Sequence, residues 1–225
     1  MSVDKNPNKI QLLFNEISSY YDIINNLISF GTHYFIKKYS IKLLKIHPNS
    51  NILDICCGTG DFTGIINKNF PSAKIIGLDF SQKMLQQAKK KYPSQTFIVG
   101  DCTNLPFKDN EFDYITVSFG LRNVENRKQA LIEAYRVMKS GGKFLHLDFS
   151  GGKINFASKF FDFMVPIFIK VFNKNIKHYK YLLESKKTYP PTQTLIKEFE
   201  NTGFYLIEKK SFVFGVISAQ VFIKN

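Results

Sequence analysis

The chain has 225 residues, and 44% of them are hydrophobic, which is enough to bury one substantial core, so we expect a single domain over 1–225. Three cysteines, two of them adjacent, argue against a disulfide framework and favour a reducing, cytoplasmic setting. The formal net charge of +13 indicates an acidic partner, either nucleic acid or an anionic membrane surface, unless it reflects only a compositional bias toward lysine.

Two helical patterns precede the first predicted strand. Apolar residues recur at intervals of three and four over 9–28, which predicts one amphipathic helix there. A second helix is predicted over 34–46, and it should stop before Pro48. We expect residues 1–48 to form an N-terminal helical lid. The polar start of the chain and the lack of any uncharged apolar stretch of about 18 residues predict neither a signal peptide nor a spanning helix.

Residues 49–150 alternate short apolar runs with helical patterns. Strands are predicted at 52–55, 74–78, 96–99, 114–118 and 143–149, and helices at 60–69, 81–91 and 126–139. Ser81 is the expected N-cap of the second of these helices, and Gly141-Gly142 is the expected stop signal of the third. Alternating strands and helices indicate right-handed βαβ units, which assemble into a parallel sheet covered on both faces.

The last part of the chain begins with residues 154–172, which are dense in aromatic side chains but too interrupted by charges and Pro166 to span a bilayer. The patterns that follow are a polar helix to about Lys187, a break at Pro190-Pro191, a helix over 194–201 and strands at 204–210 and 212–223. Because almost no loop joins the last two strands, they must be antiparallel. We therefore predict an α/β, Rossmann-like, seven-stranded sheet with a terminal antiparallel hairpin at 203–225 and a helical insertion at 151–202. This is the architecture of class I methyltransferases.

The first predicted strand ends in the sequence LDICCGTGD, which opens directly into a helix. Gly58 and Gly60 let the backbone approach a ligand closely, and the helix N-terminus offers free amides. The dinucleotide fingerprint G-x-G-x-x-G is incomplete, because Thr63 stands at the position of the third glycine. Asp54, just before the turn, suits the amino group of a cationic cofactor better than a pyrophosphate, which argues against NAD.

Two more carboxylates follow the next two predicted strands. Asp79 ends the second strand, where a ribose diol would be hydrogen-bonded. Asp101 follows the third strand and is suited to accept from an adenine amine, while Cys102 supplies an apolar contact. Each carboxylate alone is equally explained as a helix cap or a loop residue. Three acids at three successive strand ends, counting Asp54, predict a nucleoside cofactor site at the carboxyl edge of the sheet.

The segments LDICCGTGD, GLDFSQKML, GDCTNLPFKDNEFDYITVSFGLRNV and RVMKSGG resemble the ubiquinone/menaquinone biosynthesis C-methyltransferase family. FNEISSYYDIINNLISFGTH and YKYLLESKKTYP extend the resemblance to about residues 14–217. It implies S-adenosylmethionine as the methyl donor, and we expect no metal; the matching cofactor-binding positions are Thr59, Asp79, Asp101, Cys102 and Ser118. Two departures stand out: Ile36-Lys37 replaces a usual Trp-Arg, and Gln220 stands where a late histidine is common.

The resemblance also implies that the acceptor is a polyprenylated quinol. Demethylmenaquinol is the main expectation, with a 2-polyprenyl-6-methoxy-benzoquinol or demethylphylloquinol as alternatives. Methylating an aromatic carbon requires an electron-rich ring, and Arg122 is predicted to stabilise the partial phenolate that develops. The alternative for Arg122 is an ion pair with a surface carboxylate. Asn123 is expected to orient the oxygen or a relaying water, His33 to accept a proton, and Tyr21 to line the pocket.

A polyprenyl substrate must leave the bilayer, and the aromatic stretch beside its lysine-rich flank suits an interfacial mouth; a core or a homodimer face is the alternative. The phenylalanines concerned are Phe160, Phe161, Phe163, Phe168 and Phe172. We expect a protein peripheral at the inner face of the membrane and no nucleic-acid partner, because base readout favours arginine and the arginines are few. No Asn-Pro-Pro-Tyr-like motif for an extruded base follows the fourth strand. An accessory protein that binds S-adenosylmethionine without activity is the rival from another class.

Overall fold

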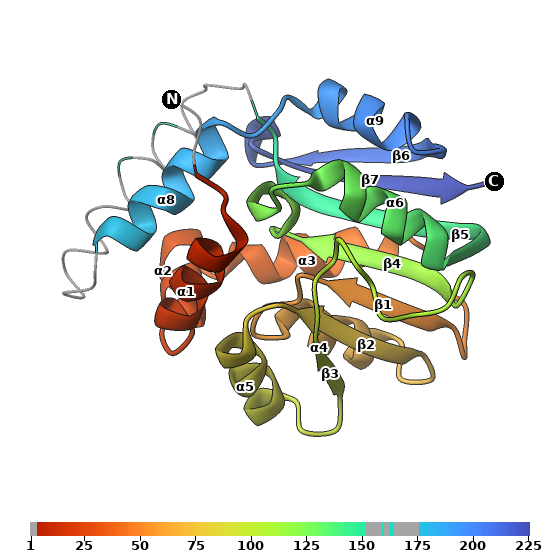
Figure 1. The fold of residues 1–225 in the computed structure, drawn as a ribbon, viewed down its shortest axis with the longest axis horizontal. Helices are drawn as coiled ribbons and strands as arrows, with labels where there is room; N and C mark the ends of the chain where they lie inside the picture. The colour runs from red at the N-terminus through yellow and green to blue at the C-terminus, as the bar shows by residue number, and fades with distance from the viewer. Residues whose placement is uncertain (1–3, 152–158, 160–162, 164–175) are drawn as a thin grey trace.

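A computed structural model describes residues 4–151, 159, 163 and 176–225 of the chain. Its centre is a seven-stranded sheet in the order β3-β2-β1-β4-β5-β7-β6, flanked by helices (Figure 1). The strands are β1 (Asn51–Ile55), β2 (Lys74–Asp79), β3 (Thr96–Val99), β4 (Phe112–Ser118), β5 (Met138–Phe149), β6 (Phe204–Phe212) and β7 (Ile217–Lys224). The helices are α1 (Pro7–Ile17), α2 (Tyr21–Ser29), α3 (Thr32–Lys42), α4 (Asp61–Asn69), α5 (Gln82–Lys91), α6 (Arg127–Val137), α8 (Ile176–Lys187) and α9 (Thr192–Glu200), with 3-10 turns η1 (Leu121–Asn123) and η2 (Val213–Gly215).

The strand directions place the carboxyl ends of the parallel strands at one edge of the sheet. β1 pairs in parallel with β2 and β4, β2 with β3, and β4 with β5. β7 runs antiparallel to both β5 and β6, so the predicted α/β sheet with a terminal antiparallel hairpin is confirmed. In Figure 1, β7 ends at the chain's C-terminus on the right of the sheet. α1 and α2 lie at the opposite end, beside the carboxyl ends of the parallel strands.

The N-terminal helical region differs from the prediction, because two helices, α1 and α2, replace the single helix expected over 9–28. α1 is capped by Asn6, whose side chain accepts hydrogen bonds from the amides of Asn8 and Lys9. The break falls at residues 18–20, where the Ser18 hydroxyl donates to the Asn15 carbonyl. Such local serine bonds compete with helix continuation. The apolar periodicity runs on through the break and therefore did not reveal it.

The pair Gly141-Gly142 also differs from its predicted role. α6 ends at Val137, and β5 starts at Met138 and runs through both glycines, so the pair does not end the helix. Gly141 has a φ of +74°, a left-handed conformation that glycine adopts without strain. The register between β4 and β5 shifts in this region, which indicates a β-bulge. Ser81, by contrast, is the N-cap of α5 as predicted, because its hydroxyl accepts from the Met84 amide.

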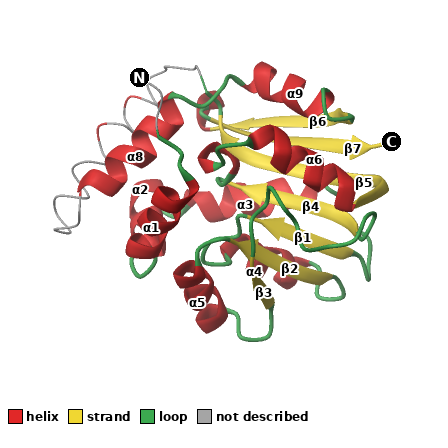
Figure 2. Cartoon of the chain, in the orientation of Figure 1, coloured by secondary structure: helices red, strands yellow, loops and turns green. Residues whose placement is uncertain are grey.

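The core lies on both faces of the sheet, which explains why the strands read as nearly continuous apolar runs. Figure 2 shows the strands at the centre of the molecule with helices around them. On β1, Ile52 packs with residues of α3 and α4, and its neighbour Leu53 packs with residues of α6 and α9. Successive strand side chains point to opposite faces, so each layer of helices covers one of them. The carboxyl edge of the sheet is left to the loops that carry the predicted site.

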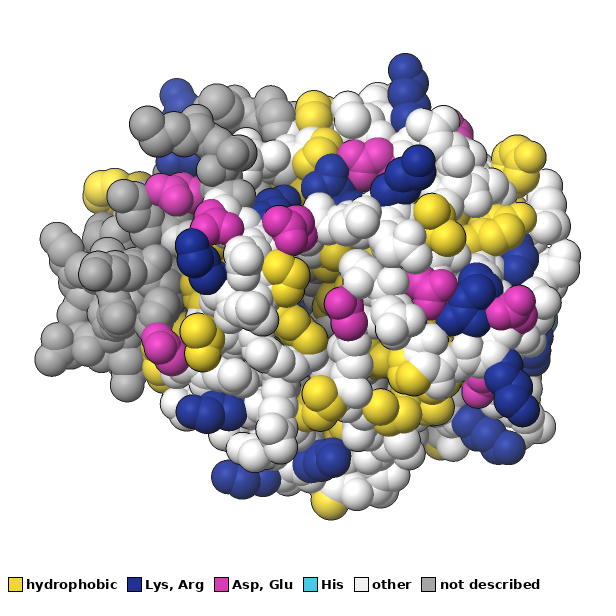
Figure 3. Space-filling model, in the orientation of Figure 1, with side chains coloured by type: hydrophobic (Ala, Val, Ile, Leu, Met, Phe, Trp, Pro, Cys, Tyr) yellow, Lys and Arg dark blue, Asp and Glu magenta, His cyan; other side chains and the backbone are white. Residues whose placement is uncertain are grey.

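The surface shows how the charge is distributed. On the face shown in Figure 3, lysine and arginine side chains are interleaved with carboxylates and do not form one basic patch. No helix among the described residues is long and apolar enough to cross a bilayer. Of the phenylalanines predicted to form an interfacial mouth, Phe163 is largely exposed, whereas Phe160, Phe161, Phe168 and Phe172 lie outside the described residues.

Candidate functional site

Two adjoining cavities follow the carboxyl ends of the parallel strands. The first has a volume of about 240 Å³ and the second about 350 Å³. Tyr21, Cys56 and Gly58 line both cavities, so the two meet at the turn between β1 and α4. The predicted site residues divide between them: Asp79, Asp101, Cys102 and Asn123 line the first cavity, and His33, Asp54, Thr59, Ser118 and Arg122 line the second.

The turn between β1 and α4 is tightly curled, with Cys56, Gly58 and Gly60 all at positive φ. A Cβ atom added at Gly58 would meet nothing within 4 Å, so glycine is needed there for its conformation and the turn stays open toward the cavities. Gly60, also a predicted cofactor-binding residue, lines neither cavity. A Cβ at Gly60 would lie 2.8 Å from the Phe97 ring, so this glycine allows close packing against β3.

Asp79 joins the end of β2 to the glycine turn. Its carboxylate accepts the Gly58 amide at 2.8 Å and the Ser81 amide at 2.9 Å. Burial raises the pKa of Asp79 to about 6, although these hydrogen bonds favour its charged form. Asp101 is exposed at the end of β3, and its Oδ1 accepts the Thr103 amide at 2.8 Å. The two carboxylates therefore face the same cavity from neighbouring strands.

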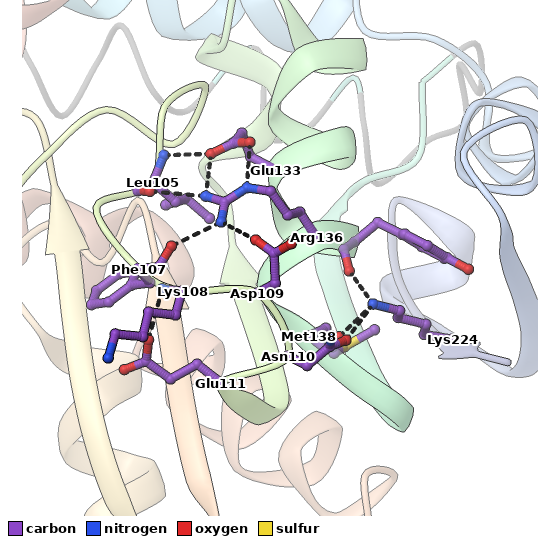
Figure 4. A network of polar contacts seen from close by, with 11 residues as sticks. Leu105, Phe107, Lys108, Asp109, Asn110, Glu111, Glu133, Arg136, Met138 and Lys224 are labelled. Carbon is purple, nitrogen blue, oxygen red and sulfur yellow. Dashed lines mark hydrogen bonds and ion pairs between the residues drawn. The ribbon is translucent and has the colours of Figure 1, made fainter.

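An arginine network holds the loop that follows Asp101 and Cys102. Arg136 of α6 donates to the Leu105 carbonyl at 3.0 Å and forms two hydrogen bonds with Glu133 (Figure 4). Glu133 in turn accepts the Leu105 amide at 2.8 Å. Because these bonds fix the loop to α6, they also fix the position of the Asp101 carboxylate at the rim of the first cavity.

Asp54 is fully buried at the end of β1 beside the second cavity. Its two carboxylate oxygens accept the hydroxyls of Thr63 at 2.7 Å and Thr116 at 2.8 Å. Burial raises the pKa of Asp54 to about 6, against the effect of these two hydroxyls. Nearby, the Ser118 hydroxyl is buried and has no hydrogen-bond partner among the described residues. The second cavity thus offers both a held carboxylate and an unused hydroxyl.

Arg122 is paired with a buried carboxylate, so the alternative of a surface ion pair is wrong. Its Nη1 donates to Asp148 Oδ1 at 2.9 Å and to the Phe119 carbonyl. The side chains of both ion-pair partners are buried. Within the described part of the chain, Arg122 Nε and Asp148 Oδ2 have no hydrogen-bond partner. The guanidinium is therefore fixed in place beside the cavity, and its Nε is a buried donor without a partner among the described residues.

His33 is held as a neutral imidazole. Its Nδ1 lies 2.6 Å from the Ser29 hydroxyl, which donates its own proton to the Asn25 carbonyl, also at 2.6 Å. Nδ1 must then carry the proton, which leaves Nε2 as an acceptor. Nε2 is buried without a hydrogen-bond partner among the described residues. Burial and the charge of Lys37 lower the pKa of His33 to about 4, so Nε2 is free of a proton at neutral pH.

Asn123 and Arg122 are consecutive residues of η1 but line different cavities. Asn123 Oδ1 accepts the Tyr181 hydroxyl at 3.2 Å, which ties η1 to α8. Burial raises the pKa of Tyr181 to about 12, so its proton stays in place at neutral pH. Tyr21, which lines both cavities, packs edge-on against Phe14 of α1.

Several residues of the site were not among the predicted ones. Asp22 of α2 accepts the Thr59 hydroxyl at 2.6 Å and pairs with Lys91 of α5 at 2.7 Å. Lys91 also pairs with Asp61, the first residue of α4. The departure from Trp-Arg at Ile36-Lys37 was the one sequence signal for this cluster, because Lys37 lies within ion-pair distance of Asp61.

A parallel sheet with an antiparallel β7, together with acidic strand ends around a glycine turn, defines a class I methyltransferase. Comparison with known proteins agrees. The chain belongs to the ubiE/COQ5 methyltransferase family, whose model matches residues 2–224. No group of three metal-ligating side chains occurs in the part of the chain that the structure describes.

Individual relatives cover nearly the whole chain. It is 38% identical to a demethylmenaquinone methyltransferase of Staphylococcus carnosus, over 96% of this chain and 93% of the relative. It is 36% identical to the protein of that name from Bacillus cytotoxicus, over 96% of this chain and 95% of the relative. Among solved structures, a SAM-dependent methyltransferase from Thermotoga maritima matches with a TM-score of 0.69 at 21% identity, covering 96% of this chain and all (100%) of that one. This last likeness concerns the fold.

Proposed function

We propose that the chain transfers a methyl group from S-adenosylmethionine to a ring carbon of a polyprenylated quinol, specifically demethylmenaquinol. The observation that carries the proposal is the second cavity, where Arg122 and the unprotonated Nε2 of His33 stand beside the glycine turn. The names of the relatives from Staphylococcus carnosus and Bacillus cytotoxicus support the naphthoquinol ring over a methoxy-benzoquinol or demethylphylloquinol.

The residues of the first cavity fit the nucleoside half of the donor. Asp79 is suited to a ribose diol, and Asp101 with Cys102 is suited to the adenine. The buried Asp54 carboxylate and the unused Ser118 hydroxyl suit the charged methionyl half in the second cavity. When bound, S-adenosylmethionine supplies an electrophilic methyl group on a sulfonium. Gly58, which lines both cavities, would lie between the two halves, and Thr59, held by Asp22, would face the methionyl half in the second cavity.

The second cavity suits an aromatic ring whose oxygen gains negative charge. Phe119 and Phe149 line it and contact each other edge-to-face at 5.5 Å between centroids. Arg122 is held by Asp148 before any ligand arrives, so it stabilises the oxygen without reorganisation. The ring carbon bonds the methyl group as the methyl–sulfur bond breaks, and loss of the proton from that carbon restores the aromatic quinol; His33 Nε2 is the proposed acceptor of the one proton released. The imidazole is unprotonated across the physiological pH range, but a pKa lowered to about 4 makes it a weak base, so it must pass the proton on to solvent.

The test is a methylation assay with the purified chain, S-adenosylmethionine and chemically reduced demethylmenaquinol. We expect a product heavier by one methylene unit, an Arg122→Ala variant with little activity, and unchanged affinity of that variant for S-adenosylhomocysteine. Arg122→Lys should recover little, because lysine does not reproduce the planar fork. A wild-type chain that binds the nucleoside but methylates no quinol would instead support the accessory role.

We propose further that the chain works as a peripheral protein at an anionic membrane surface, where the prenyl tail of the substrate resides. Phe30 and Val213 are exposed and line the second cavity, and Phe214, the residue after Val213, is 92% exposed. Lys210 lies over the ring of Tyr39, which packs against Phe212 at the end of β6. Exposed aromatic side chains flanked by lysine suit the interface of an anionic bilayer.

A further inference from the structure

Lys37 of α3 is a buried cation that the methyl transfer described above does not use. It is only 9% exposed and lines the second cavity together with Asp54, Thr59 and Asp61. Its Nζ lies 3.8 Å from Asp61 Oδ2, which is beyond hydrogen-bond distance. No hydrogen bond of Lys37 to another described residue exists in the structure. Burial lowers the pKa of Lys37, against the charges of Asp61, Asp54 and Asp22, so an anionic ligand at Nζ would favour the charged ammonium.

Asp61 does not satisfy this lysine, because a closer cation already occupies it. Lys91 bridges Asp61 Oδ1 and Asp22 Oδ2. His33 Nε2, on the other side, lies 4.0 Å from Asp61 Oδ2 and is uncharged at neutral pH. The Asp61 carboxylate is therefore shared among several neighbours, and Lys37 lies farther from it than Lys91 does.

The net charge of the cluster matches that of the donor. Asp22, Asp54 and Asp61 provide three negative charges, and Lys37 and Lys91 provide two positive ones. S-adenosylmethionine has a sulfonium, an ammonium and a carboxylate, so it brings one net positive charge. The net charge of +1 on the donor balances the formal charge of −1 on the cluster, and the lysines are the groups of the cluster that can meet its carboxylate.

The direction in which the donor lies along the two cavities decides whether Lys37 or Lys91 meets its carboxylate. Asp79 and Asp101 define the nucleoside end in the first cavity, and the shared residues Cys56 and Gly58 mark the crossing into the second. The amino-acid end then reaches the start of α4, whose first-turn amides also favour an anion. Lys37 lines this cavity, whereas Lys91 is already engaged by two carboxylates.

We propose that Lys37 binds the α-carboxylate of the methionyl part of the donor, opposite an Asp54 that faces its ammonium group. This inference rests on the proposed function, because it assumes the same donor. It also gives a role to the departure from the family's usual Trp-Arg at Ile36-Lys37, because Lys37 keeps a positive charge where the family has arginine.

The test compares two nucleosides that differ only in this carboxylate, S-adenosylmethionine and its decarboxylated form, by isothermal titration calorimetry on the full chain. The wild type should bind the carboxylated form about 10- to 100-fold more tightly, as expected for a charge-assisted hydrogen bond to a buried group. Lys37→Met should lose that preference by weakening only the carboxylated form. Lys37→Arg should retain it, and Lys38→Met, at the exposed neighbouring position, should behave like the wild type.

Each outcome is informative. A wild type that binds both nucleosides equally overturns the proposal without any variant, which keeps the test valid if Lys37→Met does not fold. Equal weakening of both ligands in a folded Lys37→Met protein would also overturn it. If the wild type binds neither nucleoside, the proposed function itself fails, and this inference fails with it.

Discussion

Replacing Asp148 by alanine should destabilise the protein strongly, because it leaves the Arg122 guanidinium buried without its carboxylate. The two side chains are 6% and 0% exposed, and they are joined at 2.9 Å. Breaking a buried pair by removing one partner typically costs about 3–5 kcal/mol, far more than the pair itself contributes relative to apolar residues. We therefore expect the free energy of unfolding to fall by about that amount.

The assay is urea unfolding followed by far-ultraviolet circular dichroism, with the m-value as a check on two-state behaviour. The matched control is Glu198→Ala, which removes the partner of Arg127 from a more exposed ion pair with side chains 18% and 30% exposed. Because this bidentate pair is only partly buried, that change should cost clearly less than Asp148→Ala. The double variant Arg122→Met with Asp148→Leu should be more stable than Asp148→Ala alone, since it leaves no unpaired buried charge. Equal losses for Asp148→Ala and Glu198→Ala would refute the reasoning.

Three other predictions concern the histidine, the surface and helix α2. In an NMR titration, the His33 ring should have a midpoint near pH 4. The midpoint should rise in Lys37→Met, because the charge of Lys37 is one cause of the lowered pKa. A wild-type midpoint near the ordinary value of 6.5 would contradict the burial of the ring. Since the folded pKa lies below the unfolded value, the contribution of His33 to stability is complete above about pH 6.5 and is lost as the pH falls toward about 4. In a flotation assay at low salt, the chain should bind phosphatidylglycerol vesicles. The double variant Phe30→Ser with Phe214→Ser should bind more weakly, whereas Tyr205→Ser, at the far end of β6, should bind like the wild type. A wild type that does not bind the vesicles would refute the membrane proposal. Amide hydrogen exchange of α2 should slow when S-adenosylhomocysteine binds, more than that of α9, and equal changes in both helices would argue against closure by α2.

The fold was predictable because its signals are local and repeated. β1, β2 and β4 are apolar runs that are each followed by a helix, and Ser81 and Gly58 mark turns by their own chemistry. The break between α1 and α2 was missed because the Ser18 hydroxyl bond is a local event inside an unbroken apolar stripe. The glycine pair at 141–142 misled because the same residue type that ends helices also permits a β-bulge.

The site was predictable where its residues follow strands, and not where they meet through tertiary packing. Asp54, Asp79 and Asp101 belong to the first group, since parallel strands bring their carboxyl ends together. Asp148 is far along the chain from Arg122, and no periodicity relates the two residues. Gln220, another departure from the family pattern, lies on β7 opposite His146 of β5 and hydrogen-bonds its Nδ1. Its place inside the sheet explains why no site role could be read from it.

The lid expected over residues 1–48 has a physical basis mainly in α2. Tyr21 lines both cavities, and the next residue, Asp22, is bound to Thr59 of the glycine turn and to Lys91 of α5. The Asp22 and Lys91 side chains are 25% and 31% exposed, and ion pairs of that exposure contribute only about 1 kcal/mol or less. Apart from these bonds, α2 buries only Ile24 among its residues, whereas α3 buries five side chains, so α2 has the weaker attachment; the five are His33, Ile36, Lys37, Ser40 and Ile41. Because Tyr21 of α2 lines both cavities, we predict that a donor bound in both would contact this helix and hold it more firmly.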